Sequence, residues 1–181
     1  MPKGDALQGV LMGVHESKRL LLDTNIYGIL FTDSGNAWIP ASIREKDFVV
    51  CGSSVIREEL RDISKAAKVK NEKLRKLTFV LYDSFVPEKR NYSVTEFVER
   101  LAEKYSENYS GTHSFQELKN DFLIIATASL HNVDIVVSND EKTMTSQKAV
   151  ESYKTVNARF ELRTPNFIKL DGLKQLLKQS L

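Results

Sequence analysis

The sequence predicts an α/β fold with a mostly parallel sheet. Short apolar runs of the kind that form buried strands alternate along the chain with longer segments of helical periodicity. Strands separated by helices are typical of parallel sheets. We expect strands at residues 20–23, 47–51, 77–82 and 134–138, with a fifth candidate around 160–163. We expect helices at residues 54–76, 93–106, 120–131 and 166–179, after a first helix that begins at Thr24 or Asn25.

Local signals mark the ends of several of these helices. Residues 93–96 read Ser-Val-Thr-Glu, which fits a capping box. Ser53 or Ser54 can cap the helix that follows. Pro165 fits the start of the last helix or the turn before it. Residues 33–45 contain a glycine and a proline, and we expect a loop or a broken helix there.

Length and composition are those of one domain. The chain has 181 residues, of which 41% are hydrophobic and 28% charged, as in an ordinary globular protein. We expect one domain over residues 18–181 and an N-terminal extension over residues 1–17, which carry three glycines and a proline. No stretch has the length and apolarity of a membrane span, and the N-terminus lacks the layout of a secretory signal. We therefore expect a cytoplasmic protein.

Charge and cysteine content exclude some function classes. The net charge of +2 is too small to identify a polyanion-binding protein by itself. Cys51 is the only cysteine, so an intrachain disulfide and a zinc site built from several cysteines are both excluded. His15, His113 and His131 show no metal-ligand spacing, and the sequence has no phosphate-binding glycine loop of the Walker type.

Four acidic residues stand at the edges of segments that we expect to be buried: Asp23, Glu59, Asp121 and Asp140. In a parallel sheet, ligands bind beyond the carboxyl ends of the strands, so these positions are compatible with one cleft. Carboxylates gathered at a buried edge repel one another unless a cation lies between them. Carboxylate oxygens suit Mg²⁺ or Mn²⁺. The pattern therefore predicts a divalent-metal site of the kind that acts on phosphodiesters.

Helical geometry selects Glu59 rather than its neighbour Glu58. At about 100° per residue, Glu59 projects into an apolar stripe that includes Ile56, Leu60 and Ile63, whereas Glu58 projects outward. Taken alone, a glutamate that reaches water from the border of this stripe explains Glu59 somewhat better than a metal ligand does.

The other three acids also have purely structural interpretations. Asp23 fits the N-cap of the helix after it, Asp121 fits the first turn of a helix, and Asp140 fits a turn. The functional interpretation depends on their joint occurrence, in this order, at these positions.

With these acids at its centre, the sequence resembles the PIN-domain nucleases, which include the VapC-type toxins. The resemblance covers roughly residues 18–172. Its segments are residues 21–25 (Leu-Leu-Asp-Thr-Asn) for the first motif, 54–60 for the second, in which the acid precedes a leucine, 121–128 for the third, 137–140 for the fourth, and 164–168 for a closing turn into the last helix.

The resemblance implies a three-layer α/β/α fold with a five-stranded, mostly parallel sheet. It implies a Mg²⁺- or Mn²⁺-dependent endoribonuclease whose catalytic metal ligands are the four acids and whose product carries a 5′-phosphate. Asn25 and Ser138 would orient ligands or bound water. Purely structural roles explain these residues equally well, with Asn25 as an ordinary turn residue and Ser138 as a hydroxyl at the end of a strand. In the small toxins of the family an antitoxin occupies the active site, so an antitoxin partner and a homodimer are further expectations.

RNA binding requires cations near the cleft. The candidates are Lys18 and Arg19, just before Asp23, and Arg57 and Arg61 beside Glu59. Residues 57–76 carry eight basic side chains in all. They could form a phosphate-binding surface, but by default such a run is interpreted as a solvated helix face.

Other function classes stay open at this point. One is a non-catalytic RNA-binding or scaffold protein that keeps the fold. A second is an RNA-processing or structure-specific nuclease rather than a toxin. A phosphatase of the haloacid-dehalogenase type is weakly supported, because that chemistry needs a second aspartate where Asn25 stands.

Overall fold

A parallel five-stranded sheet forms the centre of the molecule. The computed structural model describes residues 17–46 and 48–179. The strand order is β5-β2-β1-β6-β7, and each neighbouring pair runs parallel. The strands are β1 Lys18–Leu22, β2 Phe48–Ser53, β5 Asn91–Tyr92, β6 Ile135–Val137 and β7 Asn166–Ile168. The predicted α/β class, with five parallel strands, is confirmed.

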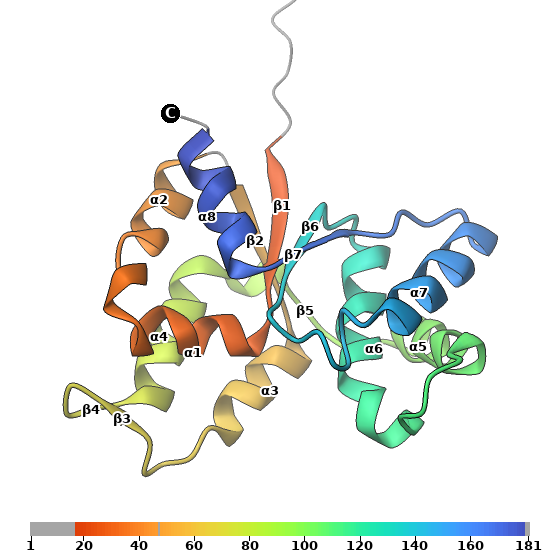
Figure 1. Ribbon diagram of the computed structural model, residues 1–181, viewed down its shortest axis with the longest axis horizontal. Coiled ribbons are helices and arrows are strands. Elements are labelled where there is room, and N and C mark those ends of the chain that lie inside the picture. Colours follow the sequence, from red (N-terminus) through yellow and green to blue (C-terminus); the bar gives the residue numbers. More distant parts are fainter. Residues whose placement is uncertain (1–16, 47, 180–181) are drawn as a thin grey trace, which may run out of the picture.

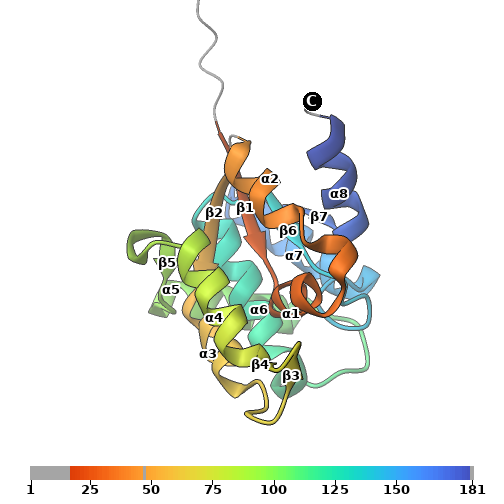
Figure 2. The same ribbon diagram turned by 90° about the vertical axis from the view of Figure 1, so that its left-hand side faces the viewer.

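Helices cover both faces of this sheet, as the two views in Figures 1 and 2 show. One layer contains α1 Thr24–Thr32, α2 Ile39–Glu45 and α4 Leu74–Phe85, and α8 Leu170–Gln179 packs against α2. The opposite layer contains α5 Glu96–Asn108, α6 Phe115–Leu130 and α7 Gln147–Arg159. Helix α3 Ser54–Asp62 follows β2, and a hairpin of β3 Lys68–Val69 and β4 Glu72–Lys73 leads from α3 to α4. The architecture is the three-layer α/β/α arrangement.

The core forms around β1 and α6. Leu20, Leu21 and Leu22 of β1 are fully buried, as expected for a central strand that is covered on both faces. Residues 122–126 of α6 are also buried, which explains why this helix is apolar nearly all round. Asp23 directly follows β1 and Asp121 lies in α6, so packing of the core fixes the positions of both acids.

Two predicted strands are wrong. Residues 77–82 lie inside α4, where Thr78, Leu81 and Tyr82 are buried at helical spacing. A short apolar run does not by itself distinguish a strand from a buried helix. Residues 160–163 follow α7 as a turn, and the edge strand forms at β7 instead. A short edge strand needs few apolar residues, which is why the sequence did not mark β7 or β5.

The predicted helix over residues 54–76 is too long, because α3 ends at Asp62 and the chain then turns into the β3–β4 hairpin. Helix α7 was not predicted. The last helix begins at Leu170 rather than Asn166, and Pro165 precedes β7. The segment over residues 33–45 is a broken helix, with a 3₁₀ turn η1 Ser34–Asn36 before α2. A second 3₁₀ turn, η2 Glu88–Arg90, precedes β5.

Helix caps explain where three of the helices begin. Ser53 accepts a hydrogen bond from the Val55 backbone and caps α3, as predicted. The capping box predicted over residues 93–96 is wrong, because Thr95 caps α5 alone. A capping box forms instead between Ser114 and Glu117, so α6 starts five residues earlier than predicted.

Two predictions fall partly outside the described residues. The N-terminal extension over residues 1–17 lies there apart from Ser17, and so does Asp47, the first residue of the predicted second strand. Within the ranges that the structure describes, no helix combines the length and the apolar character needed to cross a membrane.

Candidate functional site

The four acids lie on elements that meet at the carboxyl edge of the sheet, the lower edge in Figure 1. Asp23 directly follows β1, and Asp140 lies three residues beyond β6. Glu59 lies in the second turn of α3, which begins at the end of β2. Asp121 lies in the second turn of α6 rather than in its first turn, because that helix begins at Phe115.

Asp23 is buried and fully engaged in hydrogen bonds. Its side chain is only 5% exposed. Oδ1 accepts from the Thr24 backbone N–H at 2.7 Å, so Asp23 is the N-cap of α1. Oδ2 accepts from the Ser138 hydroxyl at 2.6 Å and from the Asn25 side-chain amide. Asp23 therefore both caps α1 and belongs to the acidic site.

Asn25 and Ser138 connect the ends of β1 and β6. The Ser138 hydroxyl accepts a hydrogen bond from the Asp140 backbone N–H at 3.0 Å while it donates to Asp23. Asn25 Oδ1 accepts from the Asn139 backbone N–H at 3.3 Å. These bonds fix the Asp23 carboxylate relative to the turn that carries Asp140.

Glu59 faces the site, and Glu58 is exposed to solvent. The Thr24 hydroxyl donates to Glu59 Oε2, and the Asn120 side-chain amide donates to Glu59 Oε1 at 2.8 Å. Thr24 belongs to α1 and Asn120 to α6, so Glu59 joins the helix layers on the two sides of the sheet. Sequence reasoning missed Thr24 and Asn120 in this role, although each is adjacent to one of the predicted acids.

Thr143 connects Asp140 and Asp121 and was also missed. Its hydroxyl donates to Asp140 Oδ2 at 2.6 Å, and its backbone N–H donates to Asp140 Oδ1 at 2.9 Å. The Lys142 backbone N–H donates to the same oxygen at 2.9 Å. Hydrogen bonding by the Thr143 side chain also stabilises the Asp121 carboxylate. The signal in the sequence was a hydroxyl three residues after a turn aspartate.

Burial and mutual repulsion perturb the ionisation of two of the acids. The pKa of Asp121 is raised to about 7, mainly by burial and further by the charges of Asp23, Asp140 and Glu59, against the hydrogen bond from Thr143. Burial likewise raises the pKa of Asp23 to about 6, with repulsion from Glu59 and Asp140, against hydrogen bonds from Ser138 and Thr24. The four acids are therefore close enough to interact electrostatically.

Asp140 behaves differently. Partial burial acts to raise its pKa, but the hydrogen bonds from Thr143 and Lys142 outweigh that effect, so the pKa lies below its usual value. Asp140 therefore stays ionised and adds its negative charge to the site next to Asp121.

These side chains are not arranged as a ready-made ligand cage. Within the described part of the chain, no group of three or more His, Cys, Asp or Glu side chains is positioned to hold a metal ion. The hydrogen bonds explain this, since they direct Glu59 toward Thr24 and Asn120 and direct Asp140 into its own turn. The chemistry of the set still fits a divalent cation, because four hard oxygen donors carry excess negative charge at one edge.

The predicted RNA-binding cations divide into two pairs. Lys18 and Arg19 lie in the first half of β1, toward the edge of the sheet opposite to Asp23. The Arg19 guanidinium donates to the Tyr92 hydroxyl, so the structure does not bring this pair to the acidic edge. Arg57 and Arg61 lie on α3 within one turn of Glu59, and Arg57 pairs with Asp83 at 3.4 Å.

Taken together, the sheet and its acidic edge define an α/β protein with clustered carboxylates at the ends of parallel strands. The family model of the PIN domain matches residues 20–149, which include all four acids. The chain belongs to the PIN domain family. No curated protein matches the sequence significantly.

Solved structures with a similar fold share little sequence with this chain. FitAB bound to an IR36 DNA fragment matches with a TM-score of 0.51 and 20% identity, over 83% of this chain and 94% of that chain. VapBC2 from Rickettsia felis, bound to a DNA fragment from its promoter, gives 0.48 and 15%, over 83% and 98%. FitAcB from Neisseria gonorrhoeae gives 0.46 and 20%, over 82% and 96%. At these identities the likeness concerns the fold.

Proposed function

We propose that the protein is a divalent-metal-dependent endoribonuclease, in which Asp23, Glu59, Asp121 and Asp140 hold Mg²⁺ or Mn²⁺ at the carboxyl edge of the sheet. The observation that carries this proposal is the pKa of Asp121, raised to about 7, and that of Asp23, raised to about 6. Asp23 is buried and Asp121 is partly buried. Raised pKa values of two acids in one site mark negative charge that is not neutralised by a cation. Membership of the PIN domain family, whose members are generally metal-dependent nucleases, supports the same conclusion.

A bound Mg²⁺ or Mn²⁺ would lower the pKa of a coordinated water and neutralise charge on the scissile phosphate. The chain's own residues prepare this chemistry. Asn25 and Ser138 hold the Asp23 carboxylate in one orientation, and Thr24 and Asn120 do the same for Glu59. Since these bonds occupy carboxylate oxygens, metal binding requires some of the side chains to turn.

The test is cleavage of end-labelled single-stranded RNA with Mn²⁺, with EDTA, and with the variant Asp121→Asn. We expect cleavage with Mn²⁺, none with EDTA, and a loss of at least about 100-fold in the variant, because a metal ligand is removed. Glu58→Gln is the control, since this acid is on the same helix α3 but is exposed to solvent. Cleavage that survives both EDTA and Asp121→Asn would disprove the assignment.

RNA binding without cleavage is the second candidate function. It is favoured by one observation, the lack of a preformed cage of three acidic ligands within the residues that the structure describes. Under this alternative, Asp121→Asn leaves RNA affinity unchanged or raises it, and no RNA is hydrolysed with Mn²⁺.

We extend the proposal to a toxin of a toxin–antitoxin pair, in which a small partner protein covers the acidic edge. The support is the FitAB complex, whose fold this chain shares. Co-expression with the product of the neighbouring gene tests this idea. Copurification with inhibition of RNA cleavage is the expected result, and independent migration of the two proteins with full activity would contradict it.

A further inference from the structure

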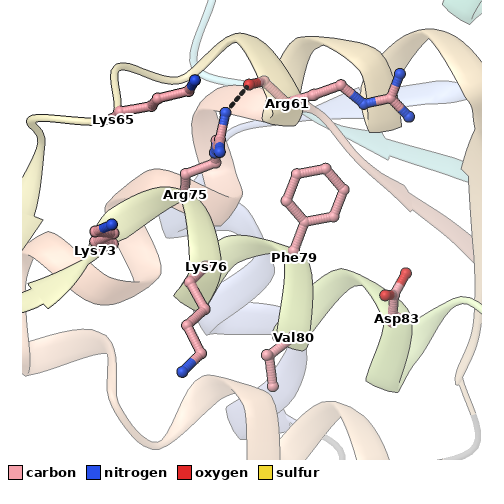
Figure 3. Close-up of a pocket in the computed structure, with 8 residues that line it drawn as sticks. All are labelled: Arg61, Lys65, Lys73, Arg75, Lys76, Phe79, Val80 and Asp83. Atoms are coloured by element: carbon pink, nitrogen blue, oxygen red, sulfur yellow. Dashed lines mark hydrogen bonds between the residues drawn. The ribbon is translucent and has the colours of Figure 1, made fainter.

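A cationic groove lies beside the acidic edge, between the end of α3, the β3–β4 hairpin and α4. Its volume is about 590 Å³. Five of its eight lining side chains are basic, although the whole chain carries a net charge of only +2. Figure 3 shows the lining residues, which are Arg61, Lys65, Lys73, Arg75, Lys76, Phe79, Val80 and Asp83.

Hydrogen bonds to backbone groups join the walls of the groove to one another. The Arg75 guanidinium donates to the Arg61 carbonyl at 3.1 Å, which joins α4 to the end of α3 (Figure 3). The Leu74 backbone N–H donates to the Ala67 carbonyl at 3.0 Å. The hairpin pairs Lys68 with Lys73 and so fixes the third wall. A site formed in advance loses less entropy on binding.

The positive charge in the groove is not neutralised by the protein. Among the described residues, none of the five basic side chains forms an ion pair, and the acid that lines the groove, Asp83, pairs with Arg57. The acids nearest along the chain, Glu58, Asp62 and Glu72, neither line the groove nor pair with these cations. Gathered like charges attract a polyanion.

The groove also offers an aromatic ring. Phe79 is partly buried and rises between α3 and α4, with the Arg57 guanidinium 5.3 Å from its ring centroid. Val80, on the same helix, is 62% exposed. Basic side chains beside an aromatic ring are the composition of channels for single-stranded nucleic acid, where phosphates meet cations and bases meet rings. The carboxylates of an acidic protein segment would pair with the cations but would not stack on the aromatic ring.

Helix α3 connects the groove to the acidic edge. Glu59 faces Thr24 and Asn120, whereas Arg61, about 3 Å further along the helix axis, lines the groove. Because Glu59 and Arg61 project from opposite sides of α3, a nucleic-acid strand would have to wrap around the end of this helix to contact both places.

We propose that this groove binds the phosphate backbone of single-stranded RNA on one side of the scissile bond. The proposal rests on the proposed nuclease function and adds a substrate subsite to it. Lys65 and Lys73 belong to different walls of the groove and are exposed, so both can be neutralised without disturbing the core.

The first experiment measures binding separately from cleavage. In the Asp121→Asn background, fluorescence anisotropy follows labelled oligouridine of about twelve nucleotides at several salt concentrations with EDTA present. Lys65→Gln with Lys73→Gln is compared with Lys148→Gln and Lys154→Gln, which remove the same charge from exposed sites on α7 in the opposite layer.

We expect the groove pair to weaken binding roughly tenfold and to lower the slope of log K against log salt by about 1.4, because each phosphate contact on a single strand contributes about 0.7. The α7 pair should change affinity less than about twofold. Equal effects of the two pairs, or none, would overturn the proposal.

Poly-glutamate distinguishes an acidic protein segment from RNA as the ligand. If the groove pair loses poly-glutamate binding and keeps RNA binding, the groove receives an acidic protein segment and the proposal is wrong. If RNA binding falls in the groove pair and poly-glutamate does not displace RNA from the parent protein, the proposal stands.

A second readout separates failure of the groove from failure of the nuclease assignment. With Asp121 intact, the groove pair should raise KM for long RNA and leave cleavage of a diuridine phosphodiester unchanged, since a dinucleotide does not reach the groove. If no substrate is cleaved by any variant, the nuclease assignment fails, and the anisotropy result still decides whether the groove binds RNA.

Discussion

Asp121 and Asp23 have pKa values raised to about 7 and about 6, and burial is the main cause for both. In the unfolded chain each carboxyl titrates near 3.8. The folded state therefore binds protons more tightly than the unfolded state, and the free energy of unfolding falls as the pH rises through this interval. Asp140 has a lowered pKa, so its contribution is lost only in more acidic solution.

The first prediction follows from these signs. In EDTA, the contribution of these two groups to the free energy of unfolding should fall between about pH 4 and about pH 7, by at most about 3 kcal/mol for Asp23 and about 4 kcal/mol for Asp121. Asp121→Asn should reduce that fall and stabilise the metal-free protein at about pH 8. Urea denaturation at a series of pH values measures both effects. A variant with the same pH profile as the parent would refute the assignment of the shift to Asp121.

The second prediction compares two neighbouring glutamates. Glu59→Gln should lower metal-dependent RNA cleavage by at least about 100-fold, because Glu59 is the acid held by Thr24 and Asn120. Glu58→Gln should retain activity within about twofold, because that side chain is exposed. Initial rates at saturating Mn²⁺ test the pair, and similar losses in both variants would contradict the assignment.

The third prediction concerns the contact between β2 and α4. A Cβ atom at Gly52 would lie 2.1 Å from the Tyr82 hydroxyl and 2.7 Å from Val86 Cγ1. Tyr82 is buried and donates to Asn91 Oδ1 at 2.6 Å, so it has little freedom to move away. Gly52→Ala should therefore lower the free energy of unfolding by about 1 to 3 kcal/mol.

Gly28→Ala provides the matched control for Gly52→Ala. Nothing lies within 4 Å of a Cβ atom at Gly28, in the middle of α1. The substitution should raise the free energy of unfolding by about 0.5 to 1 kcal/mol, since alanine favours a helix. Urea denaturation of both variants measures the two effects, and stabilisation by Gly52→Ala would refute the packing argument.

The elements that the sequence identified correctly are the ones with strong internal patterns. The continuous apolar run of β1 and the apolar helix α6 were both predicted, although α6 starts earlier than expected. Residues 77–82 were assigned to a strand because apolar residues dominate there, and only packing against α1 and α3 shows that they are helical. The two-residue strand β5 has no sequence pattern, and its pairing with β2 alone defines it.

The fourth prediction concerns the whole molecule. Binding of Mn²⁺ or Mg²⁺ to the folded state alone should raise the melting temperature, with about 2.7 kcal/mol of added stability at a metal concentration 100 times Kd. Asp23→Asn should remove this effect, because the carboxylate at the centre of the hydrogen-bond network is lost. Thermal unfolding with NaCl at matched ionic strength is the control. An unchanged melting temperature at saturating Mn²⁺ would rule out the metal site.

Charge is distributed unevenly over the molecule. Four acids lie at the carboxyl edge of the sheet and five basic side chains line the neighbouring groove, so a net charge of +2 conceals two regions of opposite sign. A metal ion would neutralise the negative charge at the acidic edge, and RNA phosphates would neutralise the positive charge in the groove.

The sequence by itself determined the α/β class and singled out the four acids, with Glu59 in place of Glu58, as candidates, because periodicity and local position indicate which side chains face a buried edge. Tertiary structure decided the rest of the site. It separated Lys18 and Arg19 from the acids, since residues at opposite ends of a strand lie at opposite edges of a sheet. It also brought Asn120 to Glu59 and folded residues 61–76 into a groove, because contacts between residues distant along the chain arise only when the layers pack.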